Sequence, residues 1–264
     1  MNGLPFWHVD AFADGPFTGN PAGVIQLDRW RDEETLRTIA REINLPATAF
    51  AVAAEDDADF EIRWFSPRGE IGLCGHGTLA AGHALIGDAQ AICFTTRTAG
   101  LVHVQRDGDR LSLSLPVIRA EPHLLPEAVA AIGGTAIETL WHERGYGILR
   151  YADEAAVRAL TPDFAALTAM GDVQFSATAA GDRTDIVSRV FTGRAGEDAV
   201  TGSAHSVLTP YWVERLGREA FTAFQASARG GWIDCRLEGE RAALSGRCLT
   251  IVEGHFALSS DYRI

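Results

Sequence analysis

Two segments of this 264-residue chain repeat each other, and the repeat constrains the fold more than any other feature. Residues 65–76 read FSPRGEIGLCGH and residues 191–203 read FTGRAGEDAVTGS. Cys74 and Thr201 hold the same place in the two copies, 127 positions apart. Each copy predicts a strand, a Gly-Glu turn, a short segment and then an apolar helix. Two copies are too few for a solenoid, so we expect two similarly folded domains related by approximate two-fold symmetry.

The starts of the two apolar helices are the candidate binding elements. Glycines lie there in both copies, and the first amides of a helix lack intrahelical partners and carry a partial positive charge. Such a helix start binds carboxylate or phosphate. We therefore expect two helix starts facing one inter-domain cleft to hold a small acid. The residues expected to bind it from these segments are Gly75, Gly77, Thr201, Gly202 and Ser203. The alternative is that these turns only cap buried helices.

Composition excludes several classes of partner. The formal net charge is −12 and Lys and Arg are not clustered, so we expect no nucleic-acid partner. The chain lacks an apolar run of membrane-spanning length and a signal peptide, so we expect a cytoplasmic protein with reduced thiols and no membrane partner. Its histidines are scattered, and it has no GxGxxG or Walker loop. We therefore expect neither a metal nor a cofactor.

Alternating apolar and polar residues predict strands at 60–64, 101–104 and 111–115. The dipeptide Asp107-Gly108 between the last two predicts a hairpin with a type I′ turn. A further hairpin is expected around Glu238-Gly239, followed by a strand over 248–252.

Helical spacing of apolar residues predicts a helix over 32–43, a second over 78–86, a third after Ser203 and a weaker one near 154–160. Prolines at 116 and 122 mark the expected domain boundary. We expect an N-terminal domain over 1–117, whose sheet the C-terminal residues could complete, and a C-terminal domain over 118–264.

Several ordered motifs resemble those of the PhzF-like family of phenazine-biosynthesis isomerases. They are residues 9–12 (VDAF), 17–23 (FTGNPAG), 73–78 (LCGHGT) and 196–205 (GEDAVTGSAH). The resemblance implies an α+β fold of the diaminopimelate epimerase type, with two pseudo-symmetric domains, each a barrel-like β-sheet wrapped around a central helix. It also implies cofactor-independent proton movement next to a carboxylate, as in the isomerisation of a dihydro-hydroxyanthranilate.

The same resemblance implies a set of site residues and shows one departure from the family. Carried over by position, the site is lined by Asn20, Gly75, His76, Asp198, Gly202 and Ser203. The family's isomerases have a Ser-Glu pair after an Asn-Leu, and the Glu is their acid/base. This chain has Pro46-Ala47 after Asn44-Leu45. Because alanine carries no proton, the mechanism based on that Glu cannot be assumed here.

Three side chains remain as catalytic candidates: His76, Asp198 and Cys74. His76 has an intrinsic pKa near neutrality and is either a base or a hydrogen-bonding positioner. Asp198 either contacts the substrate or His76, or only stabilises its turn. Cys74 lies where epimerase relatives keep a catalytic thiol, and a helix start favours a thiolate; its alternative role is structural. Asn20 is either a substrate contact or a plain turn residue.

Three functions follow from these residues. The first is a cofactor-free isomerase or epimerase that acts on a small, amino-acid-like carboxylate in the inter-domain cleft. The second, favoured by Ala47, is a non-catalytic homologue that binds a metabolite. The third is an interaction protein with a vestigial cleft. A homodimer is a candidate assembly, because sheet-rich scaffolds often bury an edge by isologous pairing.

Overall fold

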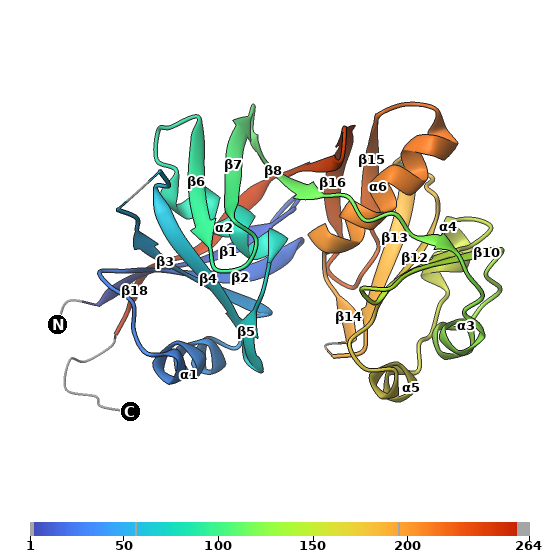
Figure 1. Cartoon of the computed structure of the whole chain (residues 1–264), viewed down its shortest axis with the longest axis horizontal. Helices are drawn as coiled ribbons and strands as arrows, with labels where there is room; N and C mark the ends of the chain where they lie inside the picture. The colour runs from blue at the N-terminus through green and yellow to red at the C-terminus, as the bar shows by residue number, and fades with distance from the viewer. Residues whose placement is uncertain (1–2, 56, 195, 258–264) are drawn as a thin grey trace. The chain divides into compact units, whose positions relative to one another are not determined.

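The computed structural model describes residues 3–55, 57–194 and 196–257, which form two compact units (Figure 1). Unit 1 holds the described residues up to Ser114 and those from Ser245 onward; unit 2 is Leu115–Leu244. The expected boundary after residue 117 lies close to this division. Strand β18 (Cys248–Phe256) pairs with β1 (Leu4–Ala11), so C-terminal residues belong to the sheet of unit 1, the possibility considered from the sequence.

Unit 1 is built on one sheet with the strand order β18-β1-β2-β3-β4-β6-β7-β8, and β5 pairs with β4. Its other strands are β2 (Asn20–Leu27), β3 (Ala47–Ala53), β4 (Phe60–Ser66), β5 (Gly69–Ile71), β6 (Ala91–Thr96), β7 (Leu101–Asp107) and β8 (Arg110–Pro116). The pairs β2/β3 and β4/β6 are parallel, and the pairs β1/β18, β1/β2, β3/β4, β6/β7 and β7/β8 are antiparallel. The strands predicted over 60–64, 101–104, 111–115 and 248–252 are confirmed.

Two helices lie on opposite sides of strands β3 and β4 in Figure 1. Helix α1 (Glu33–Ile43) begins at the N-cap Asp32, whose carboxylate accepts from the Thr35 amide, and it buries Leu36, Ile39 and Ala40. Helix α2 (Gly75–Leu85) contacts β1, β2, β3, β7 and β18. Strands from both ends and the middle of the sheet therefore surround α2, which explains why it is apolar on nearly every face.

Unit 2 repeats this arrangement with the strand order β9-β10-β11-β12-β13-β15-β16-β17, and β14 pairs with β13. Its strands are β9 (Glu121–Pro122), β10 (Glu138–His142), β11 (Tyr146–Arg150), β12 (Gln174–Ala180), β13 (Ile186–Thr192), β14 (Gly196–Asp198), β15 (Ala220–Gln225), β16 (Gly231–Glu238) and β17 (Arg241–Gly246). The parallel pairs are β11/β12 and β13/β15, at the same places in the order as β2/β3 and β4/β6. The prediction that the two copies fold alike is confirmed.

The helices of unit 2 are α3 (Pro126–Ile132), α4 (Glu154–Arg158), α5 (Phe164–Ala169) and α6 (Gly202–Leu216). Helix α6 contacts β11, β12 and β16 and buries most of its residues from Gly202 to Trp212, so it holds the central place that α2 holds in unit 1. Helices α3 and α5 were not predicted from the sequence. Over the described residues, no helix combines the length and the apolar character needed to cross a lipid bilayer.

The two expected hairpins are confirmed, but the first turn is not of type I′. Asp107 pairs with Arg110, so the two loop residues are Gly108 and Asp109 rather than Asp107 and Gly108. Gly108 has a φ of 63°, whereas Asp109 is not among the described residues with positive φ. A type I′ turn needs positive φ at both loop positions. The aspartate of the dipeptide is therefore the last strand residue, and the glycine opens the loop, as Gly239 (φ 61°) does in the second hairpin.

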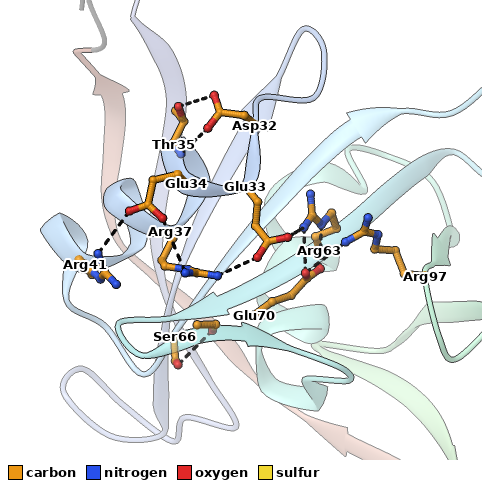
Figure 2. Close-up of polar contacts among 11 residues, drawn as sticks. Asp32, Glu33, Glu34, Thr35, Arg37, Arg41, Arg63, Ser66, Glu70 and Arg97 are labelled. Carbon is orange, nitrogen blue, oxygen red and sulfur yellow. Dashed lines mark hydrogen bonds and ion pairs between the residues drawn. The ribbon is translucent and has the colours of Figure 1, made fainter. Parts of the chain in front are cut away.

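Both units carry the same partly buried arginine–glutamate pair next to their Gly-Glu turns. Arg63 donates from Nε and Nη2 to Glu70 at 2.7 and 2.8 Å, as Figure 2 shows. Arg189 donates from the same atoms to Glu197 at 2.8 and 2.9 Å. The Arg63 guanidinium holds the pKa of the Glu70 carboxyl below its usual range. The bidentate pairs fix the turn that precedes each central helix.

Candidate active site

The starts of α2 and α6 have the same local geometry. Cys74 is the N-cap of α2 with φ −130° and ψ 100°, and Thr201 is the N-cap of α6 with φ −122° and ψ 104°. Neither residue's own side chain caps its helix. The amides of both first turns carry the partial positive charge that favours an anion. Gly75, His76 and Gly77 form the first turn of α2.

The structure brings Cys74 and His76 into contact at the start of α2. The Cys74 Sγ lies 3.6 Å from His76 Nδ1 and 3.9 Å from Nε2. The Cys74 residue is 5% exposed, and its carbonyl accepts from the Thr78 hydroxyl at 2.7 Å. A thiol and an imidazole at this distance can share a proton, and the helix start favours the thiolate.

The other three cysteines do not suit proton transfer at neutral pH. Burial raises the pKa of Cys248 to about 12 and that of Cys235 further, while burial is also the largest cause of the raised pKa of Cys93. These groups remain thiols near neutrality. Among the four cysteines, Cys74 is therefore the candidate for proton transfer.

Trp64 lies beside the same helix start and was not singled out from the sequence. The indole is 2% exposed, and Nε1 makes no hydrogen bond to another described residue. A Cβ added to Gly77 would lie 3.0 Å from both Cys74 Sγ and Trp64 Cδ1, and 3.5 Å from Nε1. The glycine at position 77 is therefore required by close packing of these two side chains. The alternation over 60–64 predicted only a core strand residue at Trp64.

Asn20 also belongs to unit 1, at the start of β2, a strand that contacts α2. It is fully buried and pairs in register with Ala11, so it is not a plain turn residue. Gly19 before it has a φ of 76°, and a Cβ there would lie 2.4 Å from the Ala11 carbonyl oxygen. Only glycine fits this position, which explains the Gly-Asn-Pro sequence.

In unit 2, Asp198 is held by its own turn. The Asp198 carboxylate accepts from the Thr201 hydroxyl at 2.6 Å and from the Ala199 amide at 3.0 Å. The Thr201 amide in turn donates to Gln225 Oε1 at 2.9 Å. These bonds fix the N-cap of α6, which is the turn role considered for Asp198. The contact with His76 considered from the sequence stays a prediction.

Ser203, in the first turn of α6, takes part in a further hydrogen-bonded group. Its hydroxyl donates to Gln174 Oε1 at 3.0 Å. Tyr146 lies on β11, a strand that α6 contacts, and burial raises the pKa of its hydroxyl. Tyr146 and Gln174 are register partners in the parallel strands β11 and β12. Neither Tyr146 nor Gln174 was predicted as a site residue. The 127-residue offset of the repeat, applied to Ala47, could have identified Gln174.

His205, one turn into α6, is buried inside unit 2. Its Nδ1 lies 2.8 Å from the Thr201 carbonyl oxygen, to which it donates, and the Ser188 hydroxyl lies 3.4 Å from Nε2. In unit 1 the residue at this position of the repeat is Thr78, whose hydroxyl binds the Cys74 carbonyl in the same way. Burial lowers the pKa of His205 to about 4.

The lowered pKa of His205 predicts that the free energy of unfolding falls in acid. Above pH 6.5, the ordinary value, His205 is neutral in both the folded and the unfolded chain. As the pH falls from 6.5 toward 4, only the unfolded chain takes the proton, so stability is lost. We expect His205 to contribute a loss of about 2 kcal/mol in the free energy of unfolding between pH 7 and pH 5.

Denaturation with guanidinium at both pH values measures this loss, with His205→Thr as the comparison because unit 1 uses threonine at this position. The variant is expected to lose about 2 kcal/mol less than the unaltered protein over the same pH range. Equal losses would show that His205 is not the responsible group.

Comparison with known proteins identifies the family. A family model described as "Phenazine biosynthesis-like protein" matches residues 9–254. The chain belongs to this family. A relative named an uncharacterised isomerase, from Pseudomonas aeruginosa, is 41% identical over 256 residues, covering 95% of this chain and 98% of the relative.

Solved structures support the fold of this phenazine biosynthesis-like protein. A PhzF-family protein from Enterococcus faecalis is 37% identical with a TM-score of 0.91, covering 97% of this chain and all of that chain. A hydroxyproline epimerase from Agrobacterium vitis, 13% identical, has a TM-score of 0.64 and covers 98% and 93% of the two chains. The α+β, diaminopimelate epimerase-like fold is thereby confirmed, and several curated relatives carry the name isomerase.

Position 47 departs from the pattern of the family's isomerases. Ala47 is the first residue of β3 and is fully buried. Its methyl group can neither donate nor accept a proton. Any proton transfer in this member of the family therefore requires another group.

Proposed function

We propose that this protein is a cofactor-independent isomerase or epimerase that moves a proton on the carbon next to the carboxylate of a small, amino-acid-like metabolite. The observation that carries the proposal is the Cys74–His76 contact at the start of α2, where the helix dipole favours an anion. The matching start of α6, with the amides of Gly202 and Ser203, offers donors of the same kind.

In this proposal, Cys74 is the base and His76 holds the proton that leaves the thiol. The thiolate takes the proton from the substrate carbon, which forms S–H and leaves an electron pair that spreads onto the carboxylate. The amides of Gly75 and Gly77 stabilise that charge, because they need no reorganisation when it develops. Return of the proton from Cys74 to the same carbon, after the substrate has turned its other face to the thiol, gives the epimer, and its return to a conjugated carbon gives the isomer. His76 then gives the thiol proton back to Cys74.

The substrate-binding residues in this proposal are Asn20 and the two helix starts. The amides of Gly202 and Ser203 supply donors from unit 2. Thr201 donates its hydroxyl proton to Asp198 and its amide proton to Gln225, so it shapes this helix start rather than donating to the substrate. A neutral or anionic acceptor group on the substrate suits these donors, whereas a cation does not.

The second candidate function is binding of the same kind of metabolite without turnover. Ala47 favours it, because the residue that moves the proton in the family's isomerases is missing. The donors at both helix starts serve binding and catalysis equally well, so their presence does not separate the two functions.

A measurement of deuterium incorporation distinguishes the isomerase function from the binding function. The protein is incubated in D₂O with cyclic and linear amino acids and with hydroxyanthranilate-like acids, and each acid is analysed by mass spectrometry. We expect the unaltered protein to introduce one deuterium into one of these acids. Incorporation by Ala47→Glu alone would instead show an intact site that lacks its acid/base, in favour of the binding function.

A further inference from the structure

Gln174 occupies in unit 2 the place that Ala47 occupies in unit 1. Each is the first residue of a seven-residue strand, β12 and β3. Each strand runs parallel to the strand before it in the sheet and antiparallel to the next. The two residues are 127 positions apart, as Cys74 and Thr201 are. Unit 2 therefore carries a polar amide at the position where unit 1 has a methyl group.

The contacts of Gln174 orient this amide. Ser203 has a single hydroxyl proton, and it donates that proton to Gln174 Oε1 at 3.0 Å. The oxygen end of the Gln174 amide is therefore turned toward Ser203, and Nε2 forms the other end.

The nitrogen of the Gln174 amide makes no hydrogen bond within the described part of the protein. Gln174 Nε2 has almost no solvent exposure and makes no hydrogen bond to any residue that the structure describes. A buried donor without a partner is costly, and in native proteins it calls for an explanation. Here the donor belongs to a side chain bonded to Ser203, a residue in the first turn of α6.

We propose that Gln174 is a substrate-binding residue whose Nε2 donates to a carboxylate oxygen of the substrate, next to the donors of Ser203 and the start of α6. The inference rests on the proposed function, because it assigns a role at the same site. It adds a donor from unit 2 to the amides already proposed for the carboxylate, and a neutral amide suits this place better than a carboxylate because the ligand is an anion.

A simpler role for Gln174 is to position Ser203, and two substitutions distinguish the roles. Gln174→Glu keeps an oxygen that accepts from Ser203 but replaces the donor by a negative charge. Gln174→Met keeps the volume and removes both polar atoms. If Gln174 only positions Ser203, Gln174→Glu is the milder change. If it binds the carboxylate, Gln174→Glu is the more severe change because of charge repulsion.

Calorimetric titration with 3-hydroxyanthranilate is the test, with Ser203→Ala as a reference and Gln105→Glu, an exposed strand residue, as the control for charge. We expect binding about 10- to 100-fold weaker in Gln174→Met, weaker still in Gln174→Glu, and unchanged in Gln105→Glu. Unchanged binding in Gln174→Met together with weak binding in Ser203→Ala would overturn the role of Gln174. Unchanged binding in both would count against the proposed function itself.

Discussion

Replacing Cys74 by alanine is expected to slow proton exchange about 10²- to 10⁴-fold, the usual contribution of a general base. The thiol lies 3.6 Å from His76 Nδ1 at a helix start that favours its anion, and no carboxylate at position 47 can replace it. The measurement is the rate of deuterium incorporation into the acid that the unaltered protein labels. A rate within threefold or so of the unaltered one would assign the base to another residue.

A matched control for this variant is Cys93→Ala. Cys93 is a partly exposed thiol of the same unit whose pKa is raised, mainly by burial. It lies on β6, away from the first turn of α2 in sequence, and should leave the exchange rate unchanged. Equal losses in the two cysteine variants would point to damage of unit 1 rather than to loss of a base.

Replacing Arg189 by methionine is expected to lower the free energy of unfolding by about 3 to 5 kcal/mol, the cost of breaking a buried ion pair. The Arg189 side chain is 12% exposed. Besides its bidentate bond to Glu197, its Nη1 donates to the carbonyl oxygens of Val157, Arg158 and Leu160 at the end of α4. The substitution leaves an uncompensated carboxylate and these carbonyls without their cation. Guanidinium denaturation measures the loss.

The matched variant is Arg63→Met in unit 1. Its partner Glu70 keeps Arg97 at 3.2 Å, and Arg63 makes an ion pair with Glu33 at 3.7 Å instead of bonds to helix carbonyls (Figure 2). We expect a smaller loss of about 1 to 2 kcal/mol, between that of a surface pair and that of a buried pair. A loss as large as that of Arg189→Met would show that the ion pair, and not the helix carbonyls, dominates.

The repeat was the part of the fold that the sequence predicted best. Glycines and charged residues at fixed spacing marked equivalent turns, and the strand order of both units agrees. The helix expected over 78–86 begins earlier, at Gly75, because glycines lower helix propensity and concealed its first turn. Helices α3 and α5 were missed because they have seven and six residues, too few for a periodic pattern.

The candidate site was predicted only where a motif marked it. The segments around Cys74 and Ser203 carry dense motifs, so their residues were found. Trp64, Tyr146 and Gln174 lie on strands, where alternation indicates only which side chains are buried. Their contacts with the helix starts depend on tertiary packing that no local pattern encodes. Gln174 could have been found by extending the repeat back from the glycines to Ala47.

We propose that the start of α6 contributes to the binding of the substrate. The most direct test is kcat/KM for deuterium exchange in Ser203→Ala, with Ser206→Ala as the control, since Ser206 lies on the same helix and its hydroxyl donates to the Ser203 carbonyl at 2.8 Å. We predict a fall of about tenfold or more in Ser203→Ala, because the hydroxyl that orients the Gln174 amide is lost, and little change in Ser206→Ala. An unchanged kcat/KM in Ser203→Ala would contradict this proposal.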